Sequence, residues 1–185
     1  VTTVCTQLLG ELLGPSERMS LRVFEHAALK RLKAAGKIQN QCWEEGWMPI
    51  EFEATVSRKC NGMEIVGKVD RIDRHPEKGL RILDYKTSDS VSDPAKAHLN
   101  TPSEGRESIQ LEVNGKLRQW HNLQLPLYRW LTAPRYPDDA LEVAYFHLPS
   151  AVSETDISIW DQEPDLTEEA ETCLKNVVDL IQKGV

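Results

Sequence analysis

Hydrophobic and polar positions follow a helical period near both ends of the chain. In the N-terminal part, apolar residues recur every three to four positions and predict a helix over residues 20–35 that ends at Gly36. The predicted buried stripe of this helix consists of Leu21, Phe24, Ala28 and Leu32. A short helix is expected within residues 1–19, and an amphipathic helix over residues 165–183.

In the middle of the chain the period shortens to two, which predicts β-strands. The runs EFEATVSRK and MEIVGKVDRID are separated by Asn61-Gly62, a strong hairpin signal. Pro76 and Gly79 then mark a turn before LRILDYKT, so three consecutive strands are expected to form an antiparallel meander. The run LEVAYFHLP predicts a fourth strand later in the chain.

The stretch between the third and fourth strands is less regular. Residues 88–114 are polar and rich in proline, serine and aspartate, and they predict a long loop. Helical character returns over residues 116–131, where Pro126 is expected in a first turn or at a kink. The order of elements predicts an α/β fold whose central mixed sheet, a meander plus a further strand, is flanked by helices.

Length and charge add limits to this picture. We expect residues 1–185 to form a single domain, a fragment of a longer chain because the first residue is Val. No apolar run approaches the roughly 18 residues of a membrane span, so no membrane partner is expected. The net charge of −7 argues mildly against a general nucleic-acid coat. A metal site built from carboxylates would, however, itself contribute negative charge.

The spacing of the cysteines predicts the redox compartment of the protein. They are widely separated and show no CxxC spacing: Cys5, Cys42, Cys60 and Cys173. This pattern predicts reduced thiols in a cytoplasmic protein and favours neither a structural zinc nor a disulfide framework.

The candidate chemistry lies on the second and third predicted strands. Asp84 and Lys86 are two residues apart, so both side chains project from the same face of a strand. Asp70, on the preceding strand, can lie across from Asp84 within reach of one cation. Hard oxygen ligands suit Mg²⁺ or Mn²⁺, and such an ion can polarise a phosphoryl oxygen and activate water. Lys86 would then orient that water or balance charge in the transition state.

Other interpretations of these charges are open. A D-x-K sequence on a strand can also be two exposed side chains. The neighbours Ile82 and Leu83 favour a buried strand, where an unpaired aspartate is unfavourable. Asp73 is an alternative to Asp70, but its odd spacing places it on the opposite strand face.

Three segments together resemble a known family. GKVDRID followed by LRILDYKT resembles the metal-binding core of the PD-(D/E)xK nuclease superfamily. The resemblance is strongest to the C-terminal nuclease domain of RecB- and AddB-type helicase–nucleases and to RecB-like exonucleases. HNLQLPLYRW resembles the Q-x-x-x-Y helix of that branch, with Gln124 and Tyr128 one helical turn apart. His26, in VFEHAALKRL, matches the helical histidine of these nucleases, so the resemblance spans residues 20–131.

The resemblance implies a restriction-endonuclease-like core and a role for each matching residue. It implies that Asp70, Asp84, the Tyr85 carbonyl and His26 bind the metal and that Lys86 is the catalytic lysine. Gln124 and Tyr128 would support the site or contact the DNA backbone. An iron–sulfur cluster is not expected, because the C-terminal part lacks a group of cysteines. Alternatively, His26 is a core-edge histidine, and the Gln/Tyr pair only packs its helix.

The leading hypothesis is therefore a Mg²⁺- or Mn²⁺-dependent deoxyribonuclease, an exonuclease of DNA recombination and repair. Its expected partners are DNA and a helicase domain or subunit. The alternative is a catalytically inactive nuclease-like domain that binds DNA or serves as a scaffold in a helicase–nuclease complex. An unrelated α/β hydrolase-like enzyme is a third possibility, but the chain has no GxSxG elbow, P-loop or dinucleotide fingerprint.

Overall fold

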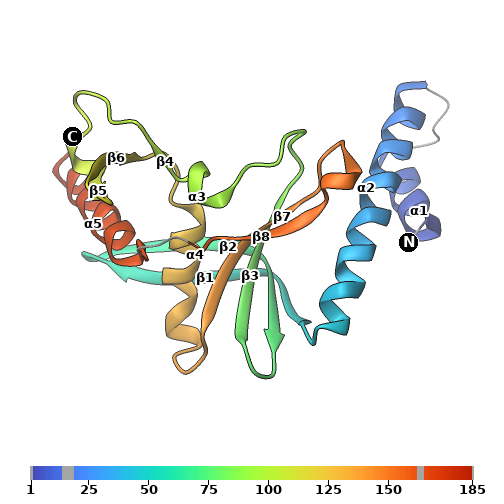
Figure 1. Cartoon of the computed structure of the whole chain (residues 1–185), viewed down its shortest axis with the longest axis horizontal. Helices are drawn as coiled ribbons and strands as arrows, with labels where there is room; N and C mark the ends of the chain where they lie inside the picture. The colour runs from blue at the N-terminus through green and yellow to red at the C-terminus, as the bar shows by residue number, and fades with distance from the viewer. Residues whose placement is uncertain (1, 14–18, 162–164, 185) are drawn as a thin grey trace. The chain divides into compact units, whose positions relative to one another are not determined.

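The computed structural model describes residues 2–13, 19–161 and 165–184 (Figure 1). The α-helices are α1 (Thr2–Leu13), α2 (Met19–Glu44), α3 (Pro94–Ala97), α4 (Gln124–Thr132) and α5 (Thr167–Lys183). Three 3₁₀-helices accompany them: η1 (Glu107–Ile109), η2 (Ala133–Arg135) and η3 (Val152–Glu154). The strands are β1 (Met48–Cys60), β2 (Met63–His75), β3 (Gly79–Lys86), β4 (Leu99–Asn100), β5 (Gln110–Val113), β6 (Lys116–Trp120), β7 (Leu141–His147) and β8 (Asp156–Ile159).

Two compact units share these elements. The first comprises Val1–Gly46, Tyr85–Val91 and Phe146–Ile157. The second comprises Trp47–Asp84, Ser92–Tyr145 and Ser158–Val185. Strands β3, β7 and β8 contribute residues to both units, and each unit is described below by itself.

A five-stranded sheet has the order β1-β2-β3-β7-β8. Strands β1, β2 and β3 form the predicted antiparallel meander. Leu80 N–H donates to the Ala140 carbonyl at the start of β3, and Leu148 N–H donates to the Lys86 carbonyl at its end, so β3 and β7 run parallel. Strand β8 returns antiparallel to β7, where Trp160 N–H bonds the Val143 carbonyl. The predicted mixed sheet flanked by helices is therefore confirmed.

Turn chemistry explains where the meander reverses. Asn61 and Gly62 both have positive φ, 46° and 83°, as a two-residue hairpin turn between β1 and β2 requires. At the start of β3, Gly79 has a φ of 88°, and a Cβ there would lie 2.3 Å from the Ala140 carbonyl oxygen. Only glycine fits this point, where the chain enters β3 directly against the residue that precedes β7.

The core of the second unit lies between the meander and helices α4 and α5. It is built from fully buried aliphatic side chains of β2, β3 and α4, including Val69, Ile72, Leu80, Ile82 and Leu125. Gly67 on β2 allows α4 to approach closely, because a Cβ at this position would lie 2.8 Å from Leu131 Cδ1. The helix that carries the Gln/Tyr pair is thus seated directly on the strand that carries Asp70.

The predicted loop and the helix after it needed correction. Within residues 88–114 the chain forms α3, β4, η1 and β5, and residues 116–120 form β6 in place of the expected helix. These strands make a second sheet of order β4-β6-β5. The hairpin between β5 and β6 turns at Asn114 and Gly115, whose φ angles of 51° and 71° match an Asn-Gly turn. Helix α4 begins only at Gln124, with Pro126 in its first turn as expected.

The N-terminal helix prediction was wrong in two respects. Helix α2 continues through Gly36 to Glu44, because one interior glycine lowers helix stability by only about 1 kcal/mol and no proline lies between Gly36 and Glu44. The chain leaves this helix at Gly46, which has a φ of 99°. The predicted stripe is not buried either: Phe24 is 55% and Leu32 39% exposed, and Leu21 and Ala28 are half-buried.

The structure also bears on the predictions for the cysteines and for a membrane span. Cys42, Cys60 and Cys173 are buried and form no disulfide, whereas the side chain of Cys5 lies outside the described part. Burial raises the pKa of the Cys173 thiol to about 11. None of the described helices is both long enough and apolar enough to cross a bilayer.

Candidate functional site

The two predicted carboxylate ligands lie on facing positions of neighbouring strands. Arg71 on β2 pairs with Leu83 on β3, and continuing this register by one residue places Asp70 opposite Asp84. Directly opposed side chains have Cβ atoms about 4.5–5.5 Å apart. Asp84 is only 4% exposed, and Asp70 is half-buried. The fold thus brings these two acids together as the sequence predicted.

Helix α4 contributes the other predicted pair. The Gln124 side-chain amide donates to Asp84 Oδ1 at 2.5 Å, and its Nε2 also lies 3.2 Å from the Tyr128 hydroxyl. Burial raises the pKa of Tyr128, the hydrogen bond with Gln124 lowers it, and the charges of Asp84 and Asp70 raise it further. Tyr128 therefore stays protonated near neutral pH and senses both carboxylates. Four predicted residues form one connected cluster.

The start of helix α4 is fixed by a buried hydrogen-bond chain. Asn122 Oδ1 accepts the N–H of Gln124 at 2.7 Å, and the Asn122 carbonyl lies 2.8 Å from Nδ1 of the fully buried His98. Because a carbonyl only accepts, the proton must be on Nδ1. In a neutral ring Nε2 then accepts the Tyr145 hydroxyl, which lies 3.2 Å away. The His98 carbonyl also accepts the His121 N–H at 2.9 Å.

Tyr145 connects this chain to the acids. Its pKa is raised to about 12 by burial and, to a lesser degree, by the charges of Asp84 and Tyr128. It therefore keeps its proton and can donate to His98. Sequence reasoning missed these supporting residues: the only local signal was Asn122, a residue type that often bonds the first N–H groups of a helix.

Asp73 takes a different role from its neighbour on β2. Its two carboxylate oxygens accept hydrogen bonds from Nε and Nη2 of Arg71, each at 2.5 Å, and both side chains are buried. Such a two-point arginine–carboxylate pair is strong and geometrically specific. The structure thus uses Asp73 as an internal counter-ion, which agrees with the preference for Asp70 as the candidate ligand.

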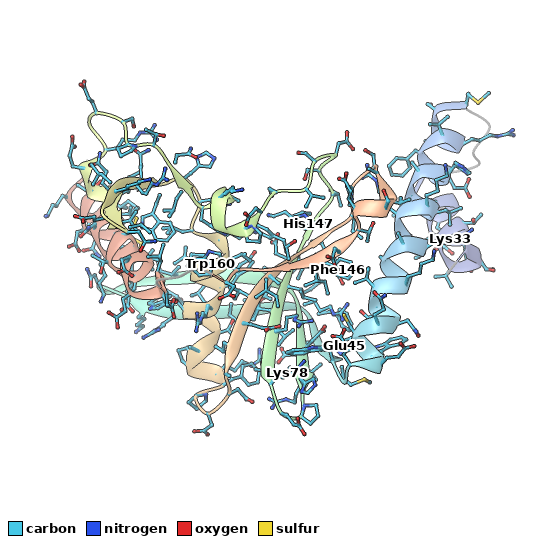
Figure 2. All side chains as sticks on the ribbon, viewed as in Figure 1. Lys33, Glu45, Lys78, Phe146, His147 and Trp160 are labelled. Carbon is cyan, nitrogen blue, oxygen red and sulfur yellow. The ribbon has the colours of Figure 1, made fainter. Side chains whose placement is uncertain are left out.

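The end of strand β3 carries the predicted lysine. Lys86 is half-buried and lies two residues after Asp84 on the same strand, and its carbonyl accepts the Leu148 N–H at 2.7 Å. The ring of Tyr85 contacts that of Phe146, labelled in Figure 2, with ring centres 5.3 Å apart. The catalytic role of Lys86 and the ligand role of the Tyr85 carbonyl remain predictions.

His26, the predicted helical ligand, is exposed on α2 in the first unit. It lines a hollow together with the basic side chains of Arg22, Lys30 and Arg31. The core-edge alternative does not fit this exposure. A ligand role for His26 stays a prediction.

The candidate oxygen donors near Asp84 are suited to a hard cation. Within the part of the chain that the structure describes, no group of three or more His, Cys, Asp and Glu side chains is arranged to hold a metal. The available set is the facing pair Asp70 and Asp84, with the backbone carbonyl of Tyr85 next along the chain. Carboxylate and carbonyl oxygens fit Mg²⁺ or Mn²⁺, which keep several waters as ligands, and do not select zinc.

Comparisons with known proteins agree with the α/β fold described above. The profile of the PD-(D/E)XK nuclease superfamily matches residues 3–185. A crystal structure described as a "putative exonuclease" from Eubacterium rectale is similar, with a TM-score of 0.51 and 14% identity. The match covers 83% of this chain but only 52% of that protein, so the chain spans about half its length. The structure of SSO0001 matches 96% of this chain and 85% of its own, with 14% identity and a TM-score of 0.36. No curated protein matches the sequence significantly.

Proposed function

The chain belongs to the PD-(D/E)XK nuclease superfamily, and we propose that it is a metal-dependent nuclease that hydrolyses phosphodiester bonds in DNA. The observation that carries the proposal is the position of Asp84. This buried carboxylate lies opposite Asp70 in the strand register and is held at 2.5 Å by the amide of Gln124. Two carboxylates at facing strand positions offer hard oxygen ligands to one divalent cation, which supports a cation site here.

Asp70, Asp84 and the Tyr85 carbonyl, with His26 as a fourth candidate, would hold the ion. When bound, Mg²⁺ or Mn²⁺ would supply positive charge to the phosphoryl oxygens and favour ionisation of water. Gln124 keeps Asp84 in one rotamer by its hydrogen bond, so that the carboxylate needs no reorientation. Tyr128 is held protonated beside it and can donate a hydrogen bond.

Lys86 is the remaining chemical group of this proposal. Its ammonium group, two residues after Asp84 on β3, would orient the attacking water or stabilise negative charge that develops on the phosphoryl group. We propose exonuclease action, in line with the name of the Eubacterium rectale protein. We also propose a role in DNA recombination or repair, which only the sequence resemblance implies.

The test is cleavage of linear and circular DNA in Mg²⁺, in Mn²⁺ and in EDTA. We expect cleavage only with a metal, and its loss in Asp84→Ala and Lys86→Ala. Lys116→Ala, which changes an exposed lysine of β6, is the matched control and should retain activity. Degradation of linear but not circular DNA would support exonuclease action. Cleavage that persists in EDTA or in both site variants would refute the proposal. Absence of cleavage together with absence of Mn²⁺ binding would favour the inactive DNA-binding alternative, whereas calorimetric Mn²⁺ binding that is lost in Asp84→Ala would indicate a nuclease that needs a partner.

A further inference from the structure

Positive charge is concentrated on helix α2. Between residues 19 and 43 the sequence has five lysine and arginine residues and a single glutamate. The whole chain, by contrast, has 22 basic and 29 acidic residues and a net charge of −7. This helix is therefore a local exception in an acidic protein, and its surface attracts anions that the rest of the chain repels.

Most of this charge lies along one face. Arg22, His26, Lys30, Lys33 and Lys37 follow one another at intervals of three or four residues, and all five are exposed. Residues at this spacing form a continuous line on a helix. We refer to these five residues as the basic stripe; Figure 2 labels Lys33 within it. At 1.5 Å per residue the stripe is about 22 Å long.

The basic stripe borders two adjoining hollows within the first unit. One, of about 420 Å³, is lined by Arg22, His26 and Lys30 of α2 and by Ser150. The other, of about 460 Å³, is lined by Lys30, Lys33, Lys37 and Ala34 and, across from them, Val152, Ser153 and Thr155 in and beside η3. Lys30 belongs to both, so the hollows follow one another along the helix.

The lysines of the stripe are not neutralised within the protein. Among the residues that the structure describes, Lys30, Lys33 and Lys37 form no ion pair. Arg31, which also lines the first hollow, shows the contrast: it bonds the Thr87 carbonyl and the Asp89 carboxylate.

Acidic groups lie near the stripe without cancelling it. They are Glu25 on α2, with Glu154 on η3 and Asp156 at the start of β8. None of the three forms a salt bridge with Lys30, Lys33 or Lys37 in the described part of the chain. These three lysines therefore keep the positive charge that an external anion requires.

We propose that the basic stripe binds the sugar–phosphate backbone of a nucleic-acid strand and guides the substrate of the proposed nuclease, on which this inference rests. A stripe about 22 Å long, on which Arg22, Lys30, Lys33 and Lys37 carry positive charge, can contact several successive phosphates of one strand. The described residues that line the two hollows include no Phe, Tyr or Trp, which supports contact with phosphates that is independent of sequence.

The experiment measures binding apart from cleavage. The protein carries Asp84→Asn and is titrated in EDTA onto a fluorescein-labelled single-stranded 20-mer, with anisotropy recorded at several salt concentrations. The test variant adds Lys30→Gln, Lys33→Gln and Lys37→Gln, and leaves His26 unchanged. The matched control makes the same change at three exposed lysines elsewhere: Lys59, Lys116 and Lys183. Circular dichroism and thermal melts confirm that both triple variants are folded.

We expect the stripe variant to bind at least about tenfold more weakly, with the slope of log K against log salt reduced by about 2, which corresponds to three phosphate contacts. The control should retain most of the affinity and slope. Equal affinity of the two triple variants would overturn the inference. Competition by poly-glutamate that is as strong as competition by unlabelled oligonucleotide would also overturn the inference, because the partner would then be an acidic protein. Wild-type cleavage with no effect of the stripe variant removes only this inference. Stripe-dependent binding without any cleavage removes only the proposed function.

Discussion

Two buried aspartates on neighbouring strands of one sheet differ in the chemical type of their hydrogen-bond partner. Asp73 on β2 is fully buried, and both of its oxygens are taken by the guanidinium of Arg71. Asp84 on β3 is nearly as buried, but the hydrogen bond from α4 that holds it comes from the uncharged amide of Gln124. The guanidinium of Arg71 both orients and neutralises Asp73, whereas the amide of Gln124 orients Asp84 without contributing a charge of its own.

The difference separates a structural acid from a chemical one. An ion pair such as Asp73 with Arg71 contributes to stability only as long as both partners are present, since either alone would be a buried charge. The amide of Gln124 positions the Asp84 carboxylate without adding charge, which is the usual role of a group that orients a metal ligand. Variants at the two positions should therefore fail in different assays.

The sharpest way to test this comparison is Asp84→Asn. The substitution preserves size and can still accept the hydrogen bond from Gln124, but it removes the negative charge. We expect DNA cleavage to fall by at least about 10³-fold, because an electrostatic site loses its central charge. The thermal midpoint should change little. A variant that keeps more than a tenth of wild-type activity would contradict the assignment of Asp84.

The opposite outcome is expected for Asp73→Asn. It leaves the Arg71 guanidinium buried without its counter-ion, so the free energy of unfolding should fall by about 3–5 kcal/mol. Urea denaturation measures this change. The double variant Arg71→Met with Asp73→Leu is the control, because removal of both charges should restore most of the stability. If the single variant is as stable as the wild type, the ion pair has no structural role.

A smaller effect on cleavage activity is expected at Gln124, which contacts Asp84. Gln124→Ala removes the amide that orients Asp84 and should lower activity by about 10- to 100-fold, as is usual for groups that orient a metal ligand. Tyr128→Phe, which keeps the ring and removes only the hydroxyl, should lower it less. The comparison uses initial cleavage rates at several Mn²⁺ concentrations, since a positioning defect weakens metal dependence as well as rate. Equal effects of both substitutions would argue against Gln124 as the orienting group.

The smallest effect concerns His147 in the first unit. Burial lowers its pKa below the ordinary value of 6.5, and the charge of Lys86 lowers it further, whereas Asp156 opposes the shift. Below pH 6.5 the unfolded state therefore binds a proton more readily than the folded state. Its contribution to stability is complete above pH 6.5 and declines as the pH falls toward the lower folded-state pKa. His147→Gln should flatten the stability profile between pH 7 and 5 in urea denaturation; an unchanged profile would show that another group titrates.

Regular patterns account for what the sequence predicted well. The meander and the last helix have strong periodicity, and Asn61-Gly62 and Gly79 mark turns that require positive φ. The sheet formed by β4, β5 and β6 was missed because its strands have two to five residues, too few for a period of two to be recognised. The length of α2 was underestimated because Gly36 was taken as a stop, although the helix continues beyond it.

The candidate site also contains residues that the sequence could predict and residues that it could not. Asp70, Asp84, Gln124 and Tyr128 could be proposed because they lie in short motifs, and the fold brings these four together. His98 and Tyr145 could not, because they are 47 residues apart and meet only after the chain has folded. Nothing local distinguishes a buried histidine that supports a helix from one that merely fills space.

The absence of a side chain at Gly67 has a consequence for the interpretation of genetic data. Because a Cβ there would lie 2.8 Å from Leu131 Cδ1 and 3.6 Å from the Tyr128 ring, alanine would displace the Leu131 side chain, and bulkier residues would press on α4, which carries Gln124. A saturation screen scored by DNA degradation would then rank this uncharged strand position alongside the acids. Such a result would reflect the spacing between α4 and β2. It would not be evidence that Gly67 has a catalytic role.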